Sequence, residues 1–366
     1  MAPQFYLGAM SGTSLDGLDI VLCDFESDQI LKHSSFFPFP DALKDALFSL
    51  CHCEQASLNQ LYTTEQAFSL FCSEAIKNFL HQHQIKADSV IAAGIHGQTI
   101  RHEPNLPNPF TVQLGDWSRM ATDTGLTIIG DFRRKDLALN GQGAPLVPPF
   151  HQAMFESNNP RVIANIGGIS NISVLKSNEP TLGYDTGPGN ALLDFWFSKH
   201  HSTHYDHNGD WARSGKIDTN LLNQLRSEPY FLQAFPKSTG RELFNPEWLT
   251  PILTEHNTVS AQDIQTTLTE LTASTLADAV KLHLNKGELF ICGGGWRNAF
   301  LVERIKELLG KNYSVDSTEA LGIHSDWIEA CAFAWLASNT INKKDSGQAS
   351  ATGADRNAIL GGIYYP

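Results

Sequence analysis

The sequence predicts an α/β protein made of two duplicated halves. An apolar strand, a turn rich in Gly, Ser and Thr, and a second apolar strand occupy residues 5–24, and the same arrangement returns at residues 161–175. A third Gly-rich turn, residues 293–295, joins an apolar strand to a helix. Duplication is the simplest explanation of such an internal repeat. We therefore expect two domains, residues 1–155 and 156–366.

Length and composition agree with this organisation. A chain of 366 residues, 42% hydrophobic and 18% charged, can build two globular cores. The net charge of -13, with no basic stripe to offset it, argues against nucleic-acid and membrane-surface partners. The N-terminus lacks the features of a secretory signal and no apolar run is long enough to span a bilayer, so we expect a cytoplasmic protein. The six scattered cysteines favour reduced thiols.

The turn of the first repeat, residues 11–17, has the composition of an anion-binding loop. Its glycines allow successive backbone N–H groups to point at one spot, and its hydroxyls add donors, so a phosphate is the simplest occupant. Taken alone, the pattern fits an ordinary long hairpin loop better. The recurrence of the same device at two further places favours a phosphate site.

The remaining elements of the first half follow from apolar spacing and breaker residues. A short strand at residues 89–93 leads into a Gly-rich turn that carries His96 and Gln98, at the position where α/β sheets place ligands. A packing role for His96 is equally consistent with the sequence. Another strand, residues 127–130, is followed closely by Arg133. The sequence also predicts helices at residues 41–52, 65–84 and 115–124. Residues 140–149 predict an irregular loop that is either a domain boundary or part of the lining of a site.

In the second half, residues 183–190 predict a sharp turn that leaves free N–H groups at the start of a helix, residues 191–199. Asp185 lies in this turn, where a helix-capping role is the alternative to a chemical one. Residues 200–251, rich in aromatics, His and Pro, have weak periodicity and indicate an elaborated region. The sequence further predicts helices at residues 260–284 and 326–338, and a strand at 288–292.

The ordered set of three Gly-rich turns resembles the superfamily of actin, sugar kinases and heat-shock chaperone ATPases. The resemblance implies two actin-like, ribonuclease H-like domains that flank an ATP cleft. It implies that the two hairpin turns hold the triphosphate and that the third turn holds adenosine. The residues implied in nucleotide binding are Gly12, Thr13, Ser14, Leu15, Asp16, Gly17, Leu18, Asp19, Gly167, Gly168, Ser170, Gly293, Gly294, Gly295 and Asn298.

More specific strings resemble the anhydro-N-acetylmuramic acid kinase family. They stand at residues 10–19, 94–99, 130–133, 141–148, 165–171 and 185–190. The resemblance implies ATP-dependent opening of 1,6-anhydro-N-acetylmuramic acid with phosphorylation of O6, during recycling of bacterial cell-wall fragments. It also implies a homodimer. The alternatives are another sugar kinase of the superfamily and a nucleotide-switched binding module; a metal hydrolase built on the Cys/His pairs is more distant.

The chemistry of an anhydro sugar suggests a single base. Water must attack C1 while O6 receives the phosphoryl group, so phosphorus replaces the acid that glycoside hydrolysis needs, and Asp185 is the candidate base. The candidate sugar-binding residues are His96, Gln98, Arg133, Gly187 and Asn190.

The placement of Mg²⁺ stays open at this point. The superfamily's usual Asp positions carry Met10 and Asn165 in this sequence. The carboxylates that remain for the ion are Asp16, Asp19, Asp185 and Glu329.

Overall fold

The computed structural model describes residues 4–12, 14–177, 179–235, 237–240 and 242–366. Contacts between Cα atoms divide the chain into two units, which we call unit 1 (Met1–Phe150 and Trp327–Pro366) and unit 2 (His151–Asp326). This grouping differs from the expected ranges 1–155 and 156–366 in the boundary, which lies after Phe150, and in the last segment. The C-terminal residues join unit 1 because their helix packs on the first sheet.

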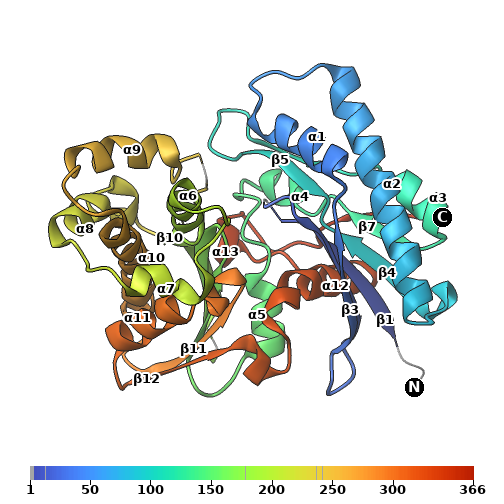
Figure 1. Ribbon diagram of the computed structural model, residues 1–366. Coiled ribbons are helices and arrows are strands. Elements are labelled where there is room, and N and C mark those ends of the chain that lie inside the picture. The colour runs from blue at the N-terminus through green and yellow to red at the C-terminus, as the bar shows by residue number, and fades with distance from the viewer. Residues whose placement is uncertain (1–3, 13, 178, 236, 241) are drawn as a thin grey trace. The chain divides into compact units, whose positions relative to one another are not determined.

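Unit 1 is built on a six-stranded sheet with the order β13-β7-β4-β1-β2-β3 (Figure 1). β1 pairs antiparallel with β2 and parallel with β4, and β4 pairs parallel with β7. The bounds are β1 Phe5–Met10, β2 Gly17–Asp24, β3 Leu31–Pro38, β4 Val90–Ile95, β7 Ile128–Gly130 and β13 Gly362–Tyr364, with a separate pair β5 Gln98–Glu103 and β6 Phe110–Leu114.

Unit 2 repeats the plan in a five-stranded sheet with the order β10-β9-β8-β11-β12. In each unit an antiparallel run, β3-β2-β1 or β10-β9-β8, continues into parallel strands, β4-β7 or β11-β12. The α/β prediction and the predicted duplication are therefore confirmed. The bounds are β8 Arg161–Ile166, β9 Ile169–Leu175, β10 Leu182–Pro188, β11 Gly287–Cys292 and β12 Tyr313–Ser317.

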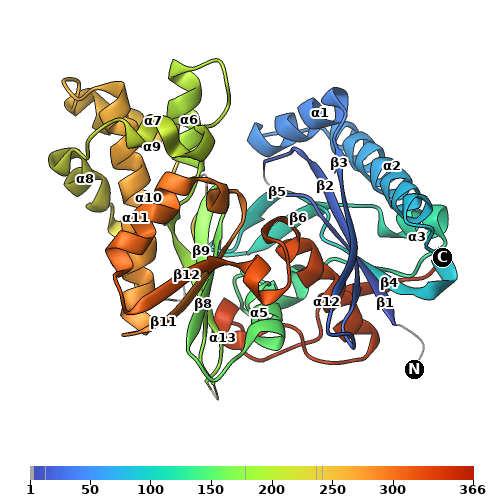
Figure 2. The same cartoon turned by 60° about the horizontal axis from the view of Figure 1, so that its bottom comes forward.

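Helices cover both faces of the unit 1 sheet (Figures 1 and 2). Along β1, Leu7 and Ala9 lie in the apolar cluster that includes residues of α1 and α2, whereas a Cβ on Gly8 would lie 2.0 Å from the Ala330 carbonyl oxygen of α12. Side chains alternate along a strand, so α12 and the α1–α2 pair are on opposite faces. The helices are α1 Asp41–His52, α2 Leu58–Gln82, α3 Trp117–Thr124, α4 Arg134–Leu137, α5 Pro148–Phe155 (which spans the unit boundary), α12 Ile328–Ile341 and α13 Ala349–Thr352.

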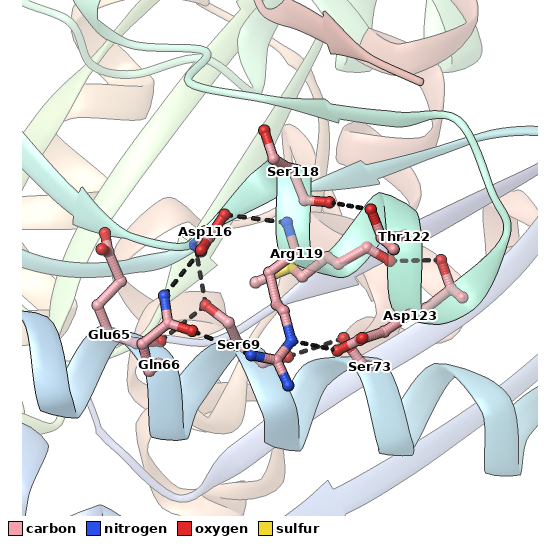
Figure 3. Close-up of polar contacts among 11 residues, drawn as sticks. Glu65, Gln66, Ser69, Ser73, Asp116, Ser118, Arg119, Thr122 and Asp123 are labelled. Carbon is pink, nitrogen blue, oxygen red and sulfur yellow. Dashed lines mark hydrogen bonds and ion pairs between the residues drawn. The ribbon is translucent and has the colours of Figure 1, made fainter. Parts of the chain in front are cut away.

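Polar contacts join α3 to α2 (Figure 3). Asp116 caps α3 by accepting from the Arg119 N–H at 2.9 Å, and its other carboxylate oxygen accepts from Gln66 of α2 at 2.7 Å. The Asp116 N–H donates to Ser69 at 2.8 Å. One cap residue therefore both ends the loop and docks the helix, which explains why α3 begins two residues after the predicted start at residue 115.

Unit 2 is organised around one long helix, α10. Ser260 caps it by accepting from the Asp263 N–H. Leu276 lies in the apolar cluster with the sheet, and Leu268 lies in a second cluster with the short helices that the weakly periodic region forms. Arg304 of α11 donates two hydrogen bonds to the carboxylate of Glu270 of α10, at 2.8 and 3.2 Å. The helices are α6 Ala191–His200, α7 Asp210–Arg213, α8 Thr219–Arg226, α9 Pro246–Glu255, α10 Ala261–His283 and α11 Ala299–Leu309.

The predicted elements differ from the structure in kind at one place and in their ends at others. Residues 183–188 form strand β10 with a bulge, because they pair with β9, where the sequence indicated a turn. The helix predicted at residues 326–338 is α12, which is followed by α13 and β13. Among the described helices, none combines the length and the apolar character needed to cross a membrane.

Candidate functional site

In unit 2 the two Gly-rich turns lie side by side. β8 and β11 are parallel neighbours whose carboxyl ends pair Asn165 with Cys292. A Cβ on Gly293 would lie 2.3 Å from Asn165 Oδ1, and a Cβ on Gly295 would lie 2.3 Å from the Ile166 side chain. Gly293 also has a φ of 76°, which favours glycine. The predicted phosphate turn and the predicted adenosine turn thus meet at the sheet edge where α/β folds bind ligands.

The start of α6 fixes the first of these turns. The Asn190 and Gly189 N–H groups donate to the carbonyls of Gly167 and Gly168, at 2.7 and 2.9 Å, and the Ala191 N–H donates to Gly168 at 3.1 Å. The N–H groups that the sequence indicated as free at this helix start are therefore used within the protein. The consequence is that α6 holds the Gly167–Gly168 turn in shape.

Three of the predicted nucleotide glycines stand where the described protein leaves room for a side chain. Among the described residues, the atom nearest to an added Cβ is Ser14 Oγ at 3.8 Å for Gly12, Ile169 O at 3.7 Å for Gly167, and Asn190 Nδ2 at 3.6 Å for Gly294. These are ordinary van der Waals distances, so packing within the protein would allow a residue with a Cβ at each of these positions. Close approach of a ligand to the backbone supplies that reason.

Other predicted nucleotide residues have roles in the fold. Ser170 is fully buried on β9, and Asn298 caps α11 by accepting from the Leu301 N–H at 3.0 Å. In unit 1, Leu15 and Leu18 belong to the core, and a Cβ on Gly17 would lie 2.3 Å from the Phe37 carbonyl oxygen of β3.

The polar part of the β1–β2 loop is exposed. The Asp16 side chain is 62% exposed and lies 3.2 Å from Lys44 of α1. Ser14 is exposed and Asp19 lies on β2, whereas Thr13 lies outside the described residues. Within the described part of the chain, no group of three or more His, Cys, Asp or Glu side chains is arranged to hold a metal ion.

Also in unit 1, three of the predicted sugar-binding side chains come together. Arg133 directs Nε and Nη2 at His96 Nε2, at 3.1 and 2.9 Å, and donates Nη1 to the Gly143 carbonyl at 2.8 Å. Gln98 donates to the Gly12 carbonyl at 3.3 Å, so this group adjoins the β1–β2 loop.

The charges of this group follow from the geometry. A guanidinium only donates, so His96 Nε2 accepts and the ring is neutral. Burial and the Arg133 charge lower the pKa of His96 well below its usual value. Glu329 of α12 is also near: burial raises its pKa, and the positive charge of Arg133 opposes that rise.

Asp185 lies on β10 at the bulge, close to Gly187. Its Oδ2 accepts from the Thr239 N–H at 2.9 Å, and its carbonyl accepts from the Tyr230 hydroxyl at 2.6 Å. Burial raises the pKa of the Asp185 carboxyl to about 7; the Thr239 N–H opposes this rise and the Glu242 charge adds to it. A carboxylate that titrates near neutral pH is suited to act as a general base.

The surroundings of Asp185 are not apparent from the sequence alone. Tyr230, Lys237, Thr239 and Glu242 belong to the region that was interpreted as an elaboration, and weak periodicity gave no reason to place it near Asp185. The signal that was available is the cluster of charged and hydroxyl residues at 237–242 inside an otherwise aromatic segment.

Comparisons with known proteins give a consistent result. A family model described as anhydro-N-acetylmuramic acid kinase matches residues 4–366. Relatives of that name are 46% identical over 368 residues in Pasteurella multocida (99% of this chain, 97% of the relative) and 47% identical over 369 residues in Shewanella oneidensis (100% and 99%).

Solved structures were compared as well. An activator of the 2-hydroxyisocaproyl-CoA dehydratase from Clostridium difficile with bound ADPNP aligns over 93% of this chain and 96% of its own, with 11% identity and a TM-score of 0.48. A ROK family glucokinase from Streptomyces griseus in complex with glucose and AMPPNP aligns over 91% and 98%, with 10% identity and a TM-score of 0.43.

Proposed function

The chain belongs to the anhydro-N-acetylmuramic acid kinase family, and we propose that it uses ATP to convert 1,6-anhydro-N-acetylmuramic acid into N-acetylmuramic acid 6-phosphate. The main support for a mechanism is the environment of Asp185, whose half-buried carboxyl has a pKa raised to about 7. It combines a defined position with a proton affinity suited to accept a proton from water at neutral pH.

The proposed reaction balances with one base. Asp185 accepts a proton from water as the water oxygen bonds to C1 of the sugar. The C1–O6 bond breaks, and its electrons remain on O6. O6 then bonds to the γ-phosphorus of ATP, and the bond from that phosphorus to the bridging oxygen of ADP breaks. The O6 leaving group therefore needs no separate acid, in contrast to ordinary glycoside hydrolysis.

Nucleotide binding is supported by the open glycines. We propose that the backbone at Gly12 and Gly167 approaches the phosphates and that the backbone at Gly294 approaches the nucleoside, because a Cβ at each would occupy space that the protein leaves open. Mg²⁺ is usually bound by one or two carboxylates together with substrate phosphates. The exposed carboxylate of Asp16 fits this requirement and would hold the ion directly or through water.

Sugar binding is proposed for the residues predicted from sequence. In unit 1, Arg133 offers its donors to the lactyl carboxylate, with His96 and Gln98 beside it. In unit 2, Gly187 adjoins the bulge that carries Asp185, and Asn190 follows β10 at the start of α6. Dependence on ATP favours a cytoplasmic location, and the resemblance to the family supports a homodimer, which sedimentation velocity would test.

Two measurements test the proposal. ADP release with and without the anhydro sugar separates this activity from a nucleotide-switched binding module, whose turnover would not depend on the sugar. In ¹⁸O-water, the label should appear on C1 and be absent from the oxygen that bridges C6 and phosphorus. Label in that bridging oxygen would show that water attacks C6 and that the C6–O6 bond breaks, which contradicts the proposed attack at C1.

A further inference from the structure

One short segment binds almost every polar group of Asp185. The Asp185 N–H donates to the Lys237 carbonyl at 3.2 Å, its carbonyl accepts from the Tyr230 hydroxyl at 2.6 Å, and its Oδ2 accepts from the Thr239 N–H at 2.9 Å. Among the described residues, Oδ1 is the polar atom of Asp185 without a hydrogen bond to the protein. We call the described residues of this stretch, 229–235 and 237–239, the clamp segment.

The sheet explains why a separate segment is needed here. β10 is the edge strand of its sheet, so none of the described strands lies along its outer side. The pairing with β9 also shifts register between Asp185 and Gly187, which interrupts the ladder. An edge position beside a bulge leaves backbone groups without sheet partners, and the clamp segment supplies them.

The clamp segment is itself held in shape. Lys237 donates to the carbonyls of Tyr230 and Phe231, at 3.0 and 3.3 Å, and its ammonium lies 4.6 Å from the centroid of the Tyr230 ring. Tyr230 is only 3% exposed. Lys237 therefore closes the segment into a loop, which brings the Tyr230 hydroxyl and the Thr239 N–H to the same residue of β10.

We propose that Tyr230 and Thr239 are positioning residues, which orient Asp185 so that Oδ1 is the oxygen that accepts the proton from water. This inference rests on the proposed role of Asp185 as the base. Tyr230 acts through the backbone of Asp185 and Thr239 through Oδ2, so neither contacts the reacting atoms. Hydrogen bonds hold three of the four polar groups of Asp185: its N–H, its carbonyl and Oδ2. A residue held in this way loses little freedom when it reacts, and such pre-organisation supports catalysis.

The test uses two tyrosines of the same unit. Tyr230→Phe removes the hydroxyl that binds the Asp185 carbonyl and keeps the ring. Tyr184→Phe is the matched control, because Tyr184 precedes Asp185 on β10 but its hydroxyl pairs with His283 of α10 at 2.9 Å. Lys237→Met is a second variant, which loosens the clamp segment at its closing contact. Asp185→Asn is measured in parallel.

We expect Tyr230→Phe to lower kcat about three- to tenfold, with KM for the sugar and for ATP unchanged within about twofold. The titratable side chains in electrostatic contact with Asp185 are Glu242 and Tyr230, and the Lys237 ammonium contacts the carbonyl and the ring of Tyr230. Tyr230→Phe loosens the clamp segment and so weakens the hydrogen bond from the Thr239 N–H to Oδ2 of Asp185. The carboxylate then loses a stabilising donor and its pKa rises, so the acid limb of the kcat–pH profile should move to higher pH. Lys237→Met should move kcat and the acid limb in the same directions, and Tyr184→Phe should change neither.

The opposite results are distinct. If Tyr230→Phe and Lys237→Met both match Tyr184→Phe, or lower the melting temperature without moving the acid limb, the clamp segment has only a structural role and the inference is wrong. If Asp185→Asn retains turnover, the proposed role of Asp185 itself fails. An inactive Asp185→Asn with normal clamp variants would overturn the inference and leave the proposed function intact.

Discussion

Replacement of Asp185 by Asn should stabilise the protein above neutral pH while it abolishes turnover. The folded state raises the pKa of this carboxyl from 3.8 to about 7. Between these values the folded protein binds a proton that the unfolded chain has lost, so stability falls as pH rises from about 4 to about 7 and stays lower above that. Asn cannot ionise, and its carbonyl oxygen can still accept from the Thr239 N–H.

The magnitude follows from the shift. Three pKa units at about 1.4 kcal/mol each set an upper limit of about 4 kcal/mol. Because Asp185 is only half-buried, solvent screens part of this energy, and we expect about 1–2 kcal/mol at pH 8. For a unit of this size that corresponds to a rise in Tm of about 3–6 °C.

Thermal unfolding of the wild type and Asp185→Asn at pH 4 and pH 8 provides the measurement. The difference in Tm should be near zero at pH 4 and positive at pH 8. Asp28→Asn, a change at an exposed turn residue, controls for the general loss of one negative charge. A variant that is no more stable than the wild type at pH 8 would refute the reasoning, since burial would then impose no cost on the charged form.

Three further predictions concern single positions. Gly12→Ala and Gly294→Ala meet no close protein atom, so they should keep the wild-type Tm yet weaken binding of a non-hydrolysable ATP analogue at least about tenfold by calorimetry; unchanged affinity in either would remove that turn from the site. Gly8→Ala would place a Cβ 2.0 Å from a carbonyl oxygen of α12, so it should lower the free energy of unfolding, measured in urea, by about 3 kcal/mol or more. A small effect would mean that α12 shifts away from β1 at little cost. Glu270→Gln should cost about 1–3 kcal/mol in the free energy of unfolding, because it leaves the partly buried Arg304 with the more exposed carboxylate of Glu307 as its ion-pair partner; a neutral result would mean that Glu307 and solvent compensate fully.

Local sequence signals predicted much of the fold. Regular apolar spacing gave the helix at residues 41–52 with the bounds of α1, and the two hairpins appear as β1–β2 and β8–β9. The helix at 65–84 was predicted too short, because α2 begins at Leu58 after a Ser57 cap in a segment with little apolar periodicity. Such errors fall at element ends, where local pattern is weakest.

The parts that could not be predicted depend on tertiary contacts. The stretch from Gly183 to Asn190 has the composition of a turn, but pairing with β9 makes most of it a strand. Grouping of His96, Gln98 and Arg133 was expected from their positions after strands, and the structure brings them together. The contact of Thr239 with Asp185 spans 54 residues of sequence without periodicity, so no local signal connected them.

The return of α12 to unit 1 has a consequence for synthesis on the ribosome. Unit 2 is an insertion in the chain of unit 1, between residues 150 and 327. The whole of unit 2 is therefore synthesised before α12 emerges from the ribosome. Until then β1 and β4 lack the helix whose backbone lies against Gly8 and Gly94, and one face of the first sheet has no cover. The usual order, in which the N-terminal domain folds first, is therefore reversed. Unit 2 can complete its core before unit 1 does, because residues 1–150 leave the ribosome first but lack α12 until the end of synthesis.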